Sequence, residues 1–256
     1  MRCQQCDYQA SVTAGTIFHR SRLQLQAWFR AMWWVTNQKS GVSALGLQRL
    51  LGLGSYRTAW IWLQKLRRAM VRPGRDQIGG PVEVDETFVG GVDAGGGRRH
   101  LGNKALVVIA AQVDGKGIGR IRLRRIPDAS SKTLISFVRD VVVPGSEVIT
   151  DGWDAYEGLK GAGFKHRPRV ISGSGKTASV LLPRVHRVAS LLKRWLLGTH
   201  QGAVSREHLA YYLDEFTFRF NRRRSASRGK LFYRLAQQAA QVDPSPYAQL
   251  VGGKPL

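Results

Sequence analysis

The sequence of 256 residues contains little cysteine, little acidic charge and no long apolar run. Its two cysteines, Cys3 and Cys6, are too close together in the chain to build a disulfide framework. No apolar stretch approaches the roughly 20 residues that a transmembrane helix needs, and the N-terminal residues lack the pattern of a signal peptide. We therefore expect a cytoplasmic protein that makes no contact with a membrane.

The charge that is present is overwhelmingly positive. Lysine and arginine number 40 against 17 aspartates and glutamates, which gives a formal net charge of +23. Such a charge attracts polyanions and releases their counterions on binding. The hydrophobic fraction of 43% is sufficient for one good-sized core and a smaller module. Nucleic acid is therefore the expected partner, and the nucleoid is the expected place in the cell.

The two cysteines form a single C-x-x-C pair near the N-terminus. This pair matches half of a four-ligand zinc site, or a redox pair. A second C-x-x-C does not occur, and the first histidine is His19. We favour residues 1–15 as an exposed remnant of half a zinc ribbon, with zinc held by Cys3 and Cys6 as the alternative.

An amphipathic helix is predicted from Arg22 to Val35, where apolar residues recur at helical spacing. Thr16 or Ser21 is placed to cap its start. The tryptophans of this helix fall on its apolar stripe rather than between basic residues. We therefore expect them in a hydrophobic core and not stacked on bases.

Two shorter helices follow, separated by a glycine-containing turn. The first is expected from Ala44 to Leu51 with Ser43 as its cap, and the second, which is basic, from Tyr56 to Met70. This is the outline of a helix-turn-helix, which would make residues 16–72 a DNA-binding module; a plain helical hairpin is the alternative. The predicted DNA contacts are Arg57, Lys65, Arg67 and Arg68.

Beyond a linker rich in proline and glycine, residues 80–242 show an α/β pattern. Three strands come first, and helices and strands then alternate before a helical C-terminal part; the strands are expected at residues 82–89, 105–113, 119–126, 147–150 and 167–172. A three-strand meander that leads into crossover units is the order of a ribonuclease H-like fold, with a mixed sheet flanked by helices.

The C-terminal helices are expected to begin at Pro183, at Ser205 and at about Lys230. Between the last two lies the basic run "RRRSASRGK". Such a run is usually solvated surface. Because it adjoins an apolar helix in a chain of high positive charge, we expect it to contact phosphates through Arg222, Arg223 and Arg224.

Two aspartates are placed to meet in this fold. Asp85 lies on the first strand, in "PVEVDETFVGG", and Asp151 directly follows the fourth strand, in "ITDGWDAY". These strands are neighbours in such a sheet, so the two carboxylates would share Mg²⁺ or Mn²⁺, the ions that activate phosphodiester chemistry. Taken singly, Asp85 could instead pair with an arginine, and Asp151 could serve as a turn residue. By strand alternation, Glu83 could share the face of Asp85, whereas Glu86 could not.

The chain resembles the transposases of bacterial insertion sequences in the segments "VEVDETFVGG", "ITDGWDAY", "SLLKRWLLGTH" and "HLAYYLDEFTFRFNRR". These are transposases of the DDE superfamily, ISXO-type group, with a ribonuclease H-like domain behind a zinc ribbon and a helix-turn-helix. The resemblance implies hydrolytic nicking at the ends of a mobile element and strand transfer by the freed 3′-hydroxyl, with Asp85 and Asp151 as the first and second acids. It also implies double-stranded DNA as partner, bound by a homodimer or a larger assembly.

The third acidic position departs from the family pattern. Many relatives carry a glutamate seven residues before a lysine; Lys193 matches this lysine, and His186 stands in place of the glutamate. Residues at i, i+4 and i+7 share a helical face, so His186, Ser190 and Lys193 would all face the site. A neutral imidazole binds Mn²⁺ or positions a water, and Lys193 would hold a DNA phosphate unless it is an ordinary exposed lysine.

Two other functions stay open at this point. In the first, the site is weakened, His186 contacts a phosphate, and the chain is a transposase relic that acts only as a DNA-binding protein. The second is a nuclease or resolvase of the same fold, which would cut without strand transfer. The zinc ribbon is also incomplete, because in the family's layout a first C-x-x-C would lie upstream of Met1. We therefore expect an internal start or a truncated reading frame.

Overall fold

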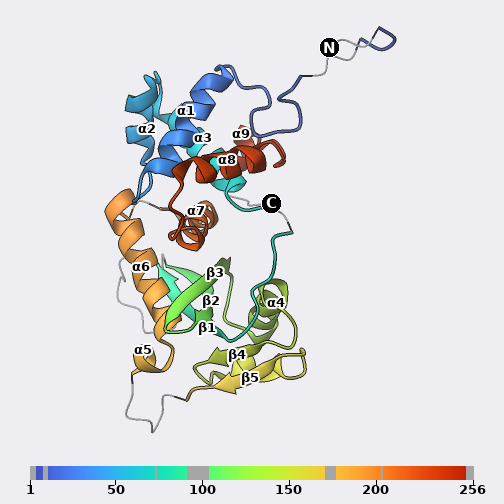
Figure 1. Cartoon of the computed structure of the whole chain (residues 1–256), viewed down its shortest axis with the longest axis vertical. Coiled ribbons are helices and arrows are strands. Elements are labelled where there is room, and N and C mark those ends of the chain that lie inside the picture. The colour runs from blue at the N-terminus through green and yellow to red at the C-terminus, as the bar shows by residue number, and fades with distance from the viewer. Residues whose placement is uncertain are drawn as a thin grey trace. The chain divides into compact units, whose positions relative to one another are not determined.

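Figure 1 shows a computed structural model of the chain, which describes residues 4–7, 11–72, 74–90, 104–170, 177–202 and 204–251. The chain forms two compact units. One comprises Met1–Gly74 and Arg224–Leu256, and the other comprises Arg75–Arg223. Within the ranges described, no helix is both long enough and apolar enough to cross a membrane.

The first unit, here called the helical unit, is built from both ends of the chain. Its helices are α1 (Leu25–Asn37), α2 (Ala44–Leu51), α3 (Tyr56–Ala69), α8 (Arg228–Ala239) and α9 (Tyr247–Val251). The predicted cap of α2 is confirmed, because Ser43 Oγ accepts from the N–H of Gly46 at 3.0 Å. The pair of short helices that the glycine turn indicated is therefore present.

Helix α8 packs against α1 and α3 of this unit. Its apolar side includes the buried Leu231 and Leu235, and Phe232 meets the ring edge of Phe29 at 6.3 Å between centroids. The sequence-based range 80–242 had joined this helix to the sheet. An amphipathic stripe reports that a helix is half buried but not which core covers it, so the sequence could not assign α8 to a unit.

Trp28 lies at the centre of the helical unit's core. Its ring stacks on Trp62 at 3.8 Å between centroids, and its indole N–H donates to Ser21 Oγ at 2.8 Å. Ser21 thus satisfies a buried tryptophan instead of capping the helix. The expectation of a cap at Thr16 or Ser21 was wrong, since α1 begins after Gln24 without a side-chain cap.

The other tryptophans of α1 behave differently from Trp28. Trp33 and Trp34 remain exposed on the opposite side of the helix, although the ring of Trp33 meets the edge of Phe232 at 5.9 Å. The expectation that these tryptophans lie in a core therefore holds for Trp28 and fails for the other two. Positions 33 and 34 fall outside the i, i+4 and i+7 stripe that Trp28, Met32 and Val35 form.

The second unit, here called the sheet unit, holds a five-stranded mixed sheet in its described residues. The strand order is β3-β2-β1-β4-β5, for β1 (Val82–Val89), β2 (Ala105–Asp114), β3 (Gly117–Ile126), β4 (Glu147–Thr150) and β5 (Lys165–Pro168). β1, β2 and β3 form an antiparallel meander, whereas β4 pairs in parallel with both β1 and β5. The predicted α/β architecture, a ribonuclease H-like mixed sheet with flanking helices, is confirmed.

Helices cover both faces of this sheet. The elements that follow the meander are α4 (Ser131–Val141), the short 3₁₀-helix η1 (Asp154–Leu159), α5 (Ala178–Leu181), α6 (Pro183–His200) and α7 (Leu209–Asn221). Side chains of α4 and η1 form the core on one face, and those of α6 and α7 form the core on the other. Val108 of β2 belongs to the first core and Ile109 to the second. Burial on both faces explains why residues 105–111 of β2 are all apolar instead of alternating.

Several elements of the sheet unit differ from expectation: α7 begins at Leu209 and not at Ser205, and β3 begins at Gly117, two residues before the predicted range 119–126. The helix expected after Asp151 is the 3₁₀-helix η1, and β5 begins two residues before the predicted range 167–172, of which residues 171 and 172 lie outside the described part. β5 is a short edge strand that is largely exposed. It therefore carries no apolar alternation from which its bounds could be read.

Candidate active site

Strands β1 and β4 bring the two predicted aspartates together. The parallel pairing aligns Val82 with Val148 and Glu83 with Ile149, and the same register continued by two residues puts Asp85 beside Asp151. Asp151 lies just past the end of β4, and its charge adds to the rise that burial causes in the pKa of the Asp85 carboxyl. The two carboxylates thus share one edge of the sheet, where the sequence predicted them.

The Asp85 carboxyl lies in an environment that disfavours its negative charge. Its pKa rises to about 6, chiefly because the group is buried; the N–H of Glu86, which donates to Oδ1 at 2.8 Å, opposes the rise, and Asp151 adds to it. His186 acts in the opposite direction and favours the charged carboxylate. A bound cation stabilises the ionised form of a carboxylate whose charge the protein compensates poorly.

His186 reaches this carboxylate from helix α6. Its Nε2 lies 3.5 Å from Asp85 Oδ2, beyond an ordinary hydrogen bond, and the atom is buried with no hydrogen-bond partner in the described part of the chain. A buried ring nitrogen is normally satisfied, so one that lacks a partner beside a carboxylate indicates a group that interacts with something else. The imidazole and the Asp85 carboxylate therefore lie close enough for one bound group to contact both.

Glu83 holds the start of α6 against β1. Its side chain is 3% exposed. Oε2 accepts from the backbone N–H groups of Arg184 at 2.7 Å and of Val185 at 3.1 Å, and Oε1 accepts from Arg184 Nη1 at 2.9 Å. A carboxylate at a helix N-terminus is favoured by the free N–H groups and by the helix dipole. Glu83 thus fixes the helix at Arg184 and Val185, the two residues before His186, on the face of β1 that also carries Asp85.

Glu86 is an acidic neighbour that the sequence did not assign to the site. It points to the other face of β1, as strand alternation predicts, where the hydroxyl of the fully buried Tyr156 donates to Oε1 at 2.9 Å. Burial raises its pKa to about 8, with Asp85 and Asp151 adding to the rise and the Tyr156 hydroxyl opposing it. Strand alternation excluded Glu86 from the face that carries Asp85, but it did not exclude a position close to the two aspartates. The high density of acids in "VEVDE" was the sequence signal for that proximity.

A sharp turn after β4 orients Asp151. The N–H of Trp153 donates to Asp151 Oδ1 at 3.1 Å, which is the turn role that the sequence offered as an alternative to a metal role. Gly152 between them has φ of +86°, and a Cβ there would lie 3.1 Å from the Val170 side chain. Only glycine fits this turn without strain. The turn engages Oδ1 and is compatible with a cation on the carboxylate.

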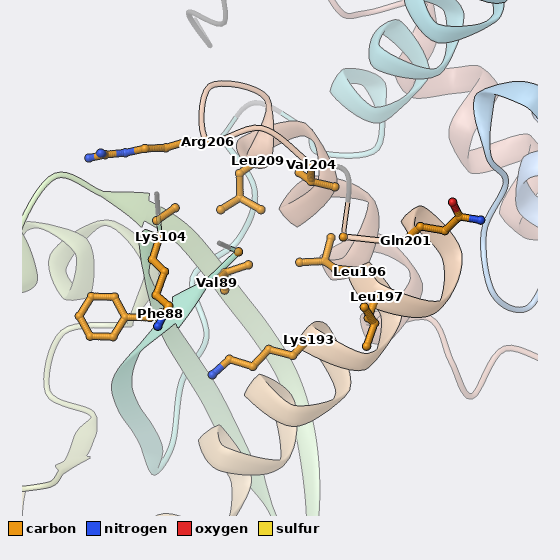
Figure 2. Close-up of a pocket in the computed structure, with 13 residues that line it drawn as sticks. Phe88, Val89, Lys104, Lys193, Leu196, Leu197, Gln201, Val204, Arg206 and Leu209 are labelled. Atoms are coloured by element: carbon orange, nitrogen blue, oxygen red, sulfur yellow. The ribbon is translucent and has the colours of Figure 1, made fainter. Parts of the chain in front are cut away.

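Lys193 lies further along α6 and lines a cavity of about 620 Å³ (Figure 2). Seven residues of helix separate it from His186, a rise of roughly 10 Å. The structure therefore brings Asp85, Asp151 and His186 together and places Lys193 beside them along the helix. Burial and the charge of Lys104 both lower the pKa of Lys193.

The predicted DNA contacts of α3 differ in exposure. Arg57 is exposed, with its guanidinium over the ring of Tyr247 at 4.1 Å, and Arg68 is half-buried. Lys65 is half-buried, and its ammonium lies 3.4 Å from the carbonyl oxygen of Ile17. Arg67 is 1% exposed, so its side chain is part of the core and does not present its charge to DNA. The number of basic residues on a helix does not show which of them are exposed and which are buried, so the sequence could not exclude Arg67 as a DNA contact.

The C-terminal arginines also fall into two groups. Arg222 and Arg223 lie over the rings of Phe218 and Phe220 at 4.1 and 4.0 Å. Arg223 also donates to the carbonyl groups of Ile118 and Gly119, which ties the end of α7 to the first residues of β3. Arg224 is exposed. Two of the three expected phosphate contacts thus also have a structural role.

The donors at the acid site fit a hard divalent cation. No group of three His, Cys, Asp or Glu side chains is arranged to hold a metal ion in the part of the chain that the structure describes. Mg²⁺ sites on phosphate-processing proteins need fewer than three protein ligands, because one or two carboxylates act together with waters and substrate phosphates. Asp85 and Asp151 meet that requirement. Of the expected zinc ligands, Cys6 is exposed with a free thiol, and Cys3 lies outside the described residues.

Known proteins are similar to this chain over the same region. Residues 77–221 match the family model described as ISXO2-like transposase domain. The chain is also 27% identical over 234 residues to a protein of Halobacterium salinarum described as "Uncharacterized protein in transposable element ISH50". That alignment covers 85% of this chain and 76% of the relative. The range 77–221 includes every residue of the acid site described above and Lys193.

Proposed function

Because the chain belongs to the ISXO2-like transposase family, we propose that it nicks DNA at the ends of an insertion sequence and transfers the freed strand to target DNA. The family supports the transposase role, and the relative's description places that protein in a transposable element. The observation that carries the chemistry is the convergence of Asp85, Asp151 and the unpartnered Nε2 of His186 at one edge of the sheet.

In this proposal Asp85 and Asp151 hold Mg²⁺ or Mn²⁺ against a DNA phosphate. The bound ion would supply Lewis-acid activation of the attacking oxygen and stabilise the leaving oxygen. His186 would position the attacking water through Nε2, and Glu83 holds the helix that carries it. Lys193 binds a phosphate of the same strand. Water first cuts the strand to leave a 3′-hydroxyl, which then attacks a phosphodiester of the target.

The helical unit is proposed to bind the element ends. Residues 16–72 would form the DNA-recognition module, and the sheet unit, residues 75–223, would be the catalytic domain, since α8 belongs to the helical unit. Arg57 and Arg68 on α3 are the proposed phosphate contacts of this module, with Arg224 near the C-terminus. Strand transfer at two ends calls for a homodimer or a larger assembly on the DNA.

The decisive experiment uses duplex DNA taken from the sequence on either side of the gene, where the ends of the element are expected. Asp85→Asn or Asp151→Asn removes a charged ligand without changing side-chain volume, and nicking in Mg²⁺ or Mn²⁺ should fall by about 10²–10³-fold while DNA binding persists. Asp140→Asn is the matched control, because Asp140 forms an exposed ion pair with Arg124 at 2.8 Å on α4. Equal nicking by the wild type and by the Asp85 and Asp151 variants would reject the proposal.

A further inference from the structure

Helices α1 and α8 carry an exposed group of aromatic rings on the surface of the helical unit. α8 comes from the C-terminal part of the chain and packs against α1 (Figure 1). The ring of Phe232 on α8 meets the rings of Phe29 and Trp33 on α1 in edge-to-face contacts, at 6.3 and 5.9 Å between centroids. Phe29 remains 42% exposed and Trp33 48% exposed. These three residues are here called the aromatic cluster.

The fold of the helical unit does not account for the exposure of these rings. The apolar stripe of α1, formed by Trp28, Met32 and Val35, is already buried in that unit's core. A contiguous group of large apolar side chains that stays in contact with water marks an interaction site on a folded domain. Trp34, which is 37% exposed, lies about 100° around the helix from Trp33, on the side away from the cluster.

The helical unit carries more than half of the chain's excess positive charge. It holds 16 lysines and arginines against two acids, whereas the sheet unit holds 24 against 15. Neither α1 nor α8 contains an acidic residue. A second copy of the chain would bring like charge against this surface, whereas a polyanion would be attracted to it. Charge complementarity therefore favours a nucleic acid over a second copy as the occupant.

Two exposed arginines flank the aromatic cluster. Arg30 lies three residues before Trp33 on α1, and Arg228 lies four residues before Phe232 on α8. Residues at these spacings are neighbours on the surface of a helix. Proteins that bind single strands combine basic side chains for the phosphates with aromatic rings on which bases stack. Because paired bases in a duplex already stack on each other, rings on a helix surface reach the face of a base only where that base is unpaired.

We propose that the aromatic cluster binds unpaired bases of a DNA strand, with Arg30 and Arg228 on the phosphates of that strand. DNA is the polymer because the chain belongs to a transposase family. The inference goes beyond the proposed function, which gives the helical unit contacts to phosphates only. A nicked or frayed element end would supply the unpaired bases.

The test reads this surface locally, because a chain of net charge +23 binds DNA at many places. A short oligothymidine, kept below saturation, is crosslinked to the full chain by ultraviolet light in EDTA, and the modified residues are mapped by mass spectrometry. We expect crosslinks within the aromatic cluster, at a yield at least about 5-fold higher than with the same thymines paired in a blunt duplex. Crosslinks confined to other residues, or an equal yield from the duplex, would overturn the proposal.

Substitutions with matched controls sharpen this test. Trp33→Ala should lower the crosslink yield at the two phenylalanines by about 5-fold or more, the equivalent of losing one stacked base, and Trp33→Phe should keep most of it. Trp34→Ala removes an exposed tryptophan from the same helix and should leave the yield unchanged. Arg30→Gln should also lower the yield, whereas Arg49→Gln, at an exposed position of α2, should not. Equal yields in the Trp33→Ala and Trp34→Ala variants would overturn the proposal.

An abasic competitor separates base recognition from phosphate binding. An abasic strand of equal length should displace the oligothymidine from the cluster at least about 5-fold less well than unlabelled oligothymidine does. Equal competition would overturn the proposal, since phosphate alone would then be recognised. Loss of self-association in Trp33→Ala, measured by sedimentation and with no crosslink in the cluster, would also overturn it, because the cluster would then join two copies of the chain.

The crosslinking assay needs neither metal nor cleavage. Its failure therefore leaves the carboxylate-dependent nicking test untouched. Normal nicking by Asp85→Asn would in turn reject the proposed function without removing the crosslinks in the aromatic cluster.

Discussion

The two ends of the β1–α6 contact carry opposite charge on the same scaffold. At one end Asp85 and Asp151 lie close together with His186, and burial and like charge raise the pKa of Asp85 to about 6. At the other end Lys104 and Lys193 share a cavity, and burial and like charge lower the pKa of Lys193. Asp85 and Lys193 therefore each carry a charge that burial and a like-charged neighbour disfavour. The acidic end suits a cation and the basic end suits a phosphate, so a DNA strand with its metal satisfies both.

The largest effect should come from Glu83, which anchors α6 at the acidic end. Glu83→Ala leaves Arg184 and two helix N–H groups without their acceptor and should lower the free energy of unfolding by about 3 kcal/mol, measured by urea denaturation. Glu147→Ala is the control, since Glu147 forms an exposed pair with Arg167 at 3.3 Å and should cost less than about 1 kcal/mol. Similar decreases in the free energy of unfolding in both variants would show that Glu83 does not hold α6 in place.

Substitution of His186 should affect nicking and leave DNA binding unchanged. His186→Ala removes the ring nitrogen beside Asp85 and should lower nicking by about 10- to 100-fold, whereas DNA binding should persist. His186→Glu introduces the acid that many relatives carry at this position, and we expect it to keep more activity than alanine does. Full activity of His186→Ala would show that the two aspartates act without it.

Without divalent ions, the melting temperature should fall as pH rises from about 5 to about 8. The folded pKa values of Asp85 and Glu86 are raised to about 6 and about 8, so their contribution to stability is present at low pH and is lost as pH rises through those values. Calorimetry should show a fall of a few degrees, since about 1 kcal/mol shifts the melting temperature by roughly 2–4 °C in a protein of this size.

Mn²⁺ should reverse that fall, because a bound cation stabilises the charged carboxylates. Glu86→Gln removes the group with the higher pKa and should flatten the upper part of the pH profile. Asp140→Asn, a change at an exposed pair, should leave the profile unchanged. A Glu86→Gln profile that coincides with that of the wild type would mean that Glu86 is not buried against the aspartates.

The smallest expected effect is on the salt dependence of DNA binding by the helical unit. Arg57 is exposed and Arg67 is buried, so Arg57→Gln should reduce the salt dependence of duplex binding by about one phosphate contact with little change in stability. Arg67→Gln should lower stability, seen as an earlier urea transition, and leave the salt slope of the folded protein unchanged. The reverse pattern would show that the burial of Arg67 does not hold in solution.

Much of this protein could be predicted from the sequence wherever a local pattern was strong. β1 and β4 have the predicted bounds, and so does α2 with its Ser43 cap, because their apolar residues and cap carry short-range signals. The edge strand β5 and the unit to which α8 belongs were not predictable in this way. Neither has a local signal, since an exposed edge shows no alternation and an amphipathic helix fits any core.

What the sequence by itself determined was the charge, the mixed sheet, and the placing of Asp85 and Asp151 on neighbouring strands. Only the tertiary structure decided that Glu83 holds α6, that Glu86 lies near the aspartates through the bond to Tyr156, that Arg67 is buried, and that Lys104 and Lys193 share a cavity. Most of these features join residues far apart in the chain. Their geometry depends on how helices pack on the sheet, which periodicity does not specify.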